Sequence, residues 1–148
     1  MNEASRNKQI AEQLKRARKE AGLSAAQVAK HLKFSTVSLF RMEDGQSAMS
    51  VERLETLAKL YGITPSSLLD GRFVRMPTSI DLDRMKAVVT LIQSVIASLD
   101  ARPSPEKVGE VTAMIYQAEI DRLLSETDGS MDFDPDHHRK TVELIFRS

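Results

Sequence analysis

Residues 23–45, LSAAQVAKHLKFSTVSLFRMEDG, decide the fold of the first half of this chain. The spacing of their small and apolar side chains predicts a short helix, a tight turn and a second short helix. The side chains that we expect to face inward are Leu23, Val28, Ala29, Leu32, Phe34, Leu39 and Met42. Those that face outward, or stand at the edge of the second helix, are Thr36, Val37, Ser38, Phe40 and Arg41. A short helix that is held rigidly on another helix has the form that enters a DNA major groove.

The segments around this stretch also have helical patterns with clear ends. An amphipathic helix is predicted from about Asn7 to Ala21, and Gly22 suits the left-handed position that ends it. Ser24 and Gln27 have the spacing of a capping box, and Ser35 and Ser50 have the positions of further N-caps. The Ser50 cap precedes a helix from Val51 to Tyr61, which ends at Gly62. Thr64-Pro65 then starts a short last turn. Residues 1–70 are therefore expected to form one small domain of five helices.

Residues 10–70 resemble the lambda-repressor-like, or XRE, family of helix-turn-helix DNA-binding domains. The matching positions are Arg18, Gly22-Leu23-Ser24, Val28-Ala29, Ser35, Leu39, Glu43, Gly45, Leu54, Leu57, Ala58, Gly62 and Leu68-Leu69. No single position is specific, but the complete order over some sixty residues is. The resemblance implies a double-stranded DNA operator as the binding partner.

The resemblance also implies roles for individual residues. Those at the positions that reach base edges are Thr36, Val37, Ser38 and Arg41. Arg41 is the strongest of them, because a guanidinium can bind guanine O6 and N7 together. Arg18 and Glu43 match a structural ion pair between the first helix and the recognition helix. Contacts to the DNA backbone are expected from Ala25, Lys30, Lys33, Gln46, Ser47 and Ser50.

Two departures from the family pattern reduce the number of contacts that we expect with DNA phosphates. Position 25 is Ala, where the family often has Gln, and the loop Gln46-Ser47-Ala48-Met49 lacks the usual basic residues. Each lost phosphate contact lowers affinity and the salt dependence of binding. We therefore expect that one copy binds weakly and that dimerisation supplies the remaining affinity.

The composition limits the classes of protein that this chain can represent. Cysteine is absent, which excludes disulfides, Cys-based zinc sites and thiol chemistry. Net charge is zero, yet residues 1–70 carry eleven Lys/Arg against eight Asp/Glu, and residues 71–148 carry ten against thirteen. The halves are thus +3 and −3, and a basic first half fits DNA binding. A signal peptide and a membrane-spanning run are not apparent, so we expect a cytoplasmic protein.

The second half has no family resemblance and is expected to be a small three-helix domain. Residues 71–78 have the composition of a linker, and residues 79–148 carry the helical patterns. The first of these helices, opened by Ser79 or Asp81 and ending near Asp100, is apolar around much of its circumference. A second helix is expected from Pro105 to about Glu126 and a last one from Pro135 to Phe146. A core of this size is small to stand alone, so we predict a dimer interface along the first helix, at Met85, Val88, Val89, Ile92, Val95, Ile96 and Leu99.

Catalytic and metal-binding patterns are weak. Asp132, Asp134, Asp136 and Glu143 have the spacing of EF-hand ligands, but Pro135 interrupts the loop and His137 replaces its glycine. His137 and His138 are adjacent, and on a helix they would point to different faces. We expect no enzyme activity, no cofactor and no metal site.

The sequence thus predicts an all-α, homodimeric transcription regulator, by default a repressor that occludes a promoter at a palindromic operator. A C-terminal surface that contacts RNA polymerase would make it an activator instead. Two other hypotheses remain. The chain could be a protein-interaction module, such as an antitoxin whose second half binds a protein partner, or its C-terminal helices could enclose a small effector.

Overall fold

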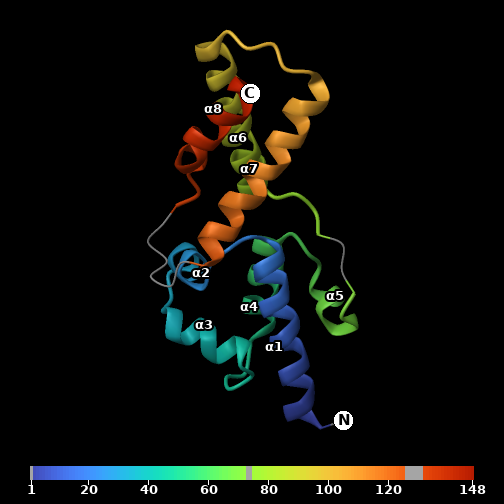
Figure 1. The fold of residues 1–148 in the computed structure, drawn as a ribbon. Coiled ribbons are helices and arrows are strands. Elements are labelled where there is room, and N and C mark those ends of the chain that lie inside the picture. The colour runs from blue at the N-terminus through green and yellow to red at the C-terminus, as the bar shows by residue number, and fades with distance from the viewer. Residues whose placement is uncertain (1, 73–74, 126–131) are drawn as a thin grey trace.

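The computed structural model describes residues 2–72, 75–125 and 132–148, and these residues form helices without any strand. The helices are α1 (Glu3–Glu20), α2 (Ala25–Leu32), α3 (Thr36–Glu43), α4 (Val51–Tyr61), α5 (Pro65–Asp70), α6 (Ser79–Leu99), α7 (Pro105–Ser125), the 3₁₀ turn η1 (Pro135–His138) and α8 (Arg139–Arg147). Figure 1 shows α1–α5 as one group and α6–α8 as a second group at one end of it. Within the described ranges, no helix is both long and apolar enough to cross a bilayer.

Helices α1–α5 surround a core to which each of them contributes. Leu14, Leu39, Leu57 and Leu68 are almost completely buried in it. Ser24, Ser35 and Ser50 each accept a backbone amide at the start of a helix, as the cap pattern predicts. The first helix is longer than predicted, because the Asn2 side chain accepts the Ser5 amide and caps it at Glu3.

Helices α6, α7 and α8 form a second core around Val88, Ile92, Ile115 and Val142. Thr78, rather than Ser79 or Asp81, is the N-cap of α6, and Asp81 completes its capping box. The predicted last helix is divided into η1 and α8. The division has a local cause, because Asp134 accepts the Asp136 amide and holds the tight turn that starts at Pro135.

The predicted dimer stripe on α6 is wrong for the greater part of its length. Val88, Ile92 and Val95 are fully buried within one chain, and the partly buried Ile96 and Leu99 pack against the same core. Helices α7 and α8 cover this face, which sequence periodicity alone could not distinguish from a face covered by a second copy. Met85 and Val89 remain exposed, and Leu82 continues their line on the outer side of α6.

A buried carboxylate, that of Glu119 on α7, ties η1 to the second core. Its oxygens accept from Arg122 Nε and Nη2, both at 2.7 Å, and from the Asp134 amide at 2.5 Å. His138 Nε2 lies 3.1 Å from Glu119 Oε1. Burial alone would raise the pKa of Glu119, but the hydrogen bonds from Arg122, Asp134 and His138 outweigh it and hold the pKa below its ordinary value of 4.5.

This carboxylate gives the unfolding of the chain a defined acid dependence. Because the pKa of Glu119 is lower in the folded state, its contribution is complete above pH 4.5 and is lost as the pH falls toward the folded value. Between about pH 5 and about pH 3, we expect the free energy of unfolding of the wild type to fall more steeply with falling pH than that of Glu119→Gln. Urea unfolding, monitored by circular dichroism, gives the free energy of unfolding of both proteins at each pH. Glu110→Gln, an exposed change on the same helix, should keep the wild-type slope, and equal slopes for all three proteins would contradict the assignment.

The two groups of helices touch at the ends of α1 and α4. Arg84 Nη1 of α6 donates to the Ala21 carbonyl at 3.2 Å. Ile120 of α7 lies so close to Gly22 that a Cβ there would be 2.5 Å from its Cδ1. Gly62 has φ +75°, and a Cβ there would overlap the Met76 carbonyl oxygen. Both turns therefore have a second reason for glycine besides backbone conformation.

Candidate nucleic-acid interface

The turn between α2 and α3 is fixed by local hydrogen bonds. Lys33 adopts the left-handed conformation, with φ +60°, and the Phe34 amide donates to the Ala29 carbonyl at 3.0 Å. The Ser35 hydroxyl accepts the Ser38 amide at 3.1 Å and lies 2.8 Å from the Ser38 hydroxyl. These contacts set the angle at which α3 leaves α2.

The outer face of α3 is exposed and lies away from α6–α8 (Figure 1). Val37 is 59% exposed and Phe40 is 47% exposed, and Arg41 is exposed beside them. Thr36 and Ser38 are half-buried, and Leu39 and Met42 anchor the opposite face in the core. The structure thus brings the four predicted base-contact residues onto one short helix, with Arg41 and Val37 the more accessible.

Arg18 and Glu43 form a buried, bidentate ion pair between α1 and the end of α3. Arg18 Nε lies 2.6 Å from Glu43 Oε1, and Nη2 lies 3.2 Å from Oε2. Arg18 Nη1 also donates to the Leu23 carbonyl at 2.9 Å. One guanidinium therefore connects α1 with α3 and with the turn that precedes α2. Tyr61 packs nearby, and burial, followed by the charge of Glu43, raises its pKa and keeps the phenol neutral. This cluster makes the position of α3 rigid.

The residues that are predicted to contact the DNA backbone differ in their exposure and in their hydrogen bonds within the protein. The Gln46 amide donates to the Arg41 carbonyl at 2.9 Å, which leaves the exposed Gln46 side chain as the group of this residue that can contact phosphate. The Ser50 hydroxyl accepts the Arg53 amide at 3.1 Å and keeps its own proton for donation. Lys33 is exposed beside α3, Ser47 is half-buried, and Ala25 is buried at the start of α2. Lys30 lines a cleft on another side of α2.

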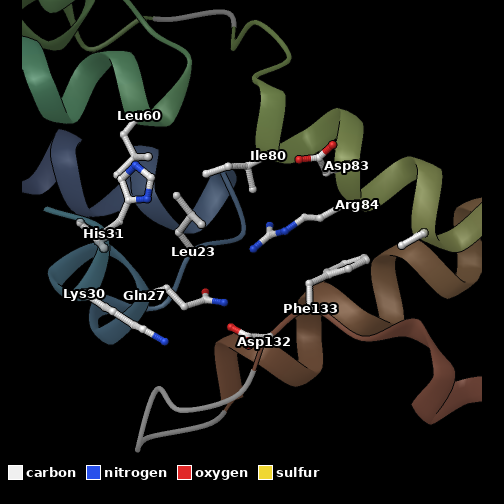
Figure 2. A pocket seen from close by; sticks show the side chains of 12 residues that line it. Leu23, Gln27, Lys30, His31, Leu60, Ile80, Asp83, Arg84, Asp132 and Phe133 are labelled. Carbon is white, nitrogen blue, oxygen red and sulfur yellow. The ribbon is translucent and has the colours of Figure 1, made fainter.

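That cleft, of about 660 Å³, lies between the helix-turn-helix region and α6 (Figure 2). Its polar lining includes Lys30, His31, Asp83, Arg84 and Asp132, and its apolar lining includes Leu23, Val28, Leu60, Ile80 and Phe133. Arg84 is not among the residues predicted from motifs, although a pattern in the sequence marks it. Arg84 precedes Val88 by four residues and therefore lies on the apolar stripe of its own helix.

The acidic residues with EF-hand spacing do not gather around a common point. Asp134 caps η1, and Asp136 pairs with Arg139 at 2.8 Å. In the ranges that the structure describes, no three His, Asp or Glu side chains are placed to hold a metal ion together.

A comparison with protein-family models identifies the first of the two groups of helices. Residues 9–69 match the model of a helix-turn-helix domain. This match agrees with the resemblance found in the sequence, and α1–α5 form such a domain, which further helices follow. Searches of curated proteins and of solved structures found no significant match. Helix-turn-helix domains are DNA-binding modules of transcription regulators.

Proposed function

We propose that the helix-turn-helix domain makes this chain a sequence-specific transcription regulator that reads its operator with the outer face of α3. The observation that carries the proposal is the exposed face of Val37, Phe40 and Arg41 on a helix fixed by the buried Arg18–Glu43 pair. Arg41 binds a guanine edge, and Val37 or the Thr36 methyl group contacts a thymine methyl group. Further contacts to the DNA backbone or to base edges come from Ser38, Lys33, Ser47 and Ser50.

The active form in this proposal is a homodimer on a palindromic operator. With the Gln46 amide bonded internally and Ala25 without a polar side chain, one copy has few groups for phosphate. Two linked copies recover affinity through their joint binding to two half-sites. The exposed outer side of α6, with Leu82, Met85 and Val89, is the dimer surface that we favour in place of the buried stripe.

Repression by occlusion of a promoter is the mechanism that we propose. A dimer over two half-sites one helical turn apart covers DNA that the polymerase needs. The alternative in which the C-terminal helices bind a different protein, as in an antitoxin, uses the same exposed side of α6. Co-purification of a second protein that requires Met85 and Val89 would favour it.

Selection of bound duplexes from a random DNA library tests this function directly. We expect an enriched motif with two-fold symmetry and half-sites about 10 base pairs apart, or a multiple of that spacing. Sedimentation of the same protein preparation should show a dimer at micromolar concentration. A folded protein that enriches no sequence would contradict the proposal, and an asymmetric motif bound by a monomer would contradict the dimer.

A further inference from the structure

The cleft between the two groups of helices contains a buried positive charge. Arg84 is 5% exposed, its Nη1 donates to the Ala21 carbonyl at 3.2 Å, and its guanidinium carbon lies 5.1 Å from the centre of the Phe133 ring. Tyr116 is close enough for its hydroxyl and the Arg84 charge to interact. No carboxylate among the residues that the structure describes lies within ion-pair distance of Arg84.

Two carboxylates, those of Asp81 and Glu119, influence the charge of Arg84 from a distance, but both are bound to other groups. Asp81 pairs with Arg75 and caps α6, and Glu119 binds Arg122 and the start of η1. A buried charge without a counter-ion is unfavourable, and burial lowers the pKa of Arg84 accordingly. An added anion would supply the missing counter-charge, and the planar guanidinium matches a carboxylate in geometry.

The cleft has the dimensions and the lining of a small-molecule site. Its volume of about 660 Å³ lies within the usual range for ligand pockets, and such pockets often occur between structural units. Figure 2 shows the Arg84 guanidinium directed into the cleft from α6, with Leu23 and Gln27 on the opposite wall. Leu23, Ile80 and Phe133 provide apolar surface beside the guanidinium.

The other charges of the cleft restrict the ligand. Lys30 and His31 stand on the α2 side, whereas Asp83 and Asp132 stand on the side of α6 and η1. The two aspartates would repel a phosphate or a dicarboxylate more strongly than a ligand with one negative charge. The lining therefore favours one carboxylate on an apolar body.

We infer that this cleft binds a small organic monocarboxylate, whose carboxylate pairs with Arg84 and whose apolar body packs on Leu23, Ile80 and Phe133. Such a ligand is an effector of DNA binding, and this part of the inference rests on the proposed function. The walls of the cleft come from both groups of helices, and Arg84 itself holds the end of α1. A ligand that engages Arg84 therefore changes how α6 is held against the helix-turn-helix domain.

Calorimetric titration of the full chain without DNA tests the site. The probes are cinnamate and octanoate, each compared with its neutral amide, cinnamamide and octanamide. We expect saturable binding of at least one carboxylate, about ten- to a hundredfold tighter than its amide, because the charged hydrogen bonds to Arg84 are lost in the amide. Binding of neither carboxylate to folded protein, or equal binding of acid and amide, would overturn the inference.

Variants locate the site. Arg84→Met should weaken carboxylate binding by about ten- to a hundredfold, and Arg84→Lys should retain part of it. Arg102→Met, which changes an exposed arginine outside the cleft, should leave it unchanged. If Arg84→Met does not fold, the exposed change Lys30→Glu gives a second test, with about threefold weaker binding expected against no change for Lys59→Glu. Unchanged binding in folded Arg84→Met, or in Lys30→Glu when Arg84→Met is unfolded, would place the ligand elsewhere and overturn the inference.

The effector role is tested by measuring DNA affinity with and without the bound carboxylate. The bound carboxylate should change the affinity for the selected duplex by at least about fivefold, the lower end of ordinary allosteric coupling. A saturated cleft with unchanged DNA affinity would overturn the effector role. Because the titration contains no DNA, failure of the proposed function would leave the result for the ligand site intact.

Discussion

Replacing Glu43 with leucine should lower the free energy of unfolding by about 3–5 kcal/mol. The Glu43 side chain is 2% exposed and is bound at both oxygens by Arg18, which is itself 7% exposed. Leucine has a similar size, so Glu43→Leu leaves little cavity and chiefly leaves the Arg18 guanidinium buried without its counter-ion. The loss should appear in urea unfolding monitored by circular dichroism.

A double variant separates the ion pair from general damage to the core. Arg18→Met together with Glu43→Leu removes both charges, and we expect it to regain most of the stability lost in Glu43→Leu. Glu20→Gln breaks the exposed Arg16–Glu20 pair and should cost no more than about 0.5 kcal/mol. A double variant as unstable as Glu43→Leu would show that the unpaired charge is not the cause.

Replacing Arg41 with alanine should weaken binding to the selected duplex by about five- to 150-fold, since one bidentate contact to guanine contributes about 1–3 kcal/mol of discrimination. Arg41 is exposed on α3, next to Val37, and is not part of the buried pair that holds the helix. The fold should therefore be retained. A fluorescence-anisotropy titration at fixed salt gives the affinity, and repeating the selection shows whether the guanine preference at one position is lost.

Two control variants distinguish a base contact of Arg41 from a general effect of charge and from a phosphate contact. Arg102→Ala removes an exposed arginine from the turn between α6 and α7 and should leave DNA affinity within twofold or so of the wild type. Lys33→Ala should weaken all duplexes about equally, because a phosphate contact carries no sequence information. A uniform loss in Arg41→Ala, with the motif unchanged, would assign Arg41 to the backbone rather than to a base.

The helix-turn-helix part was largely predictable because its determinants are local. Ser24, Ser35 and Ser50 cap helices through side chains three residues from the amides that they accept, and such spacing can be read from sequence. The pairing of Arg18 with Glu43 joins positions 25 residues apart, and only the family resemblance indicated it. The face of α3 that is left exposed follows from the apolar spacing of Leu39 and Met42.

The second half was less predictable because its packing is not local. An apolar stripe on α6 must be covered, but periodicity does not say whether α7 and α8 or another copy covers it. Val88 and Ile92 are covered by the chain itself. The cleft was also beyond the sequence, because it forms only where Arg84 of α6 meets the end of α1.

We expect the exposed face of α3 to lie against the bases of the operator. The chain has no cysteine, so a single introduced thiol can carry an iron chelate that cleaves nearby DNA. The two sites are Val37→Cys on α3 and Leu144→Cys on α8, positions that are 59% and 68% exposed. On the selected duplex, the chelate at position 37 should cleave within the enriched motif, and the chelate at position 144 should not. Cleavage from position 144 alone, or no cleavage from position 37 while the protein is bound, would contradict the account.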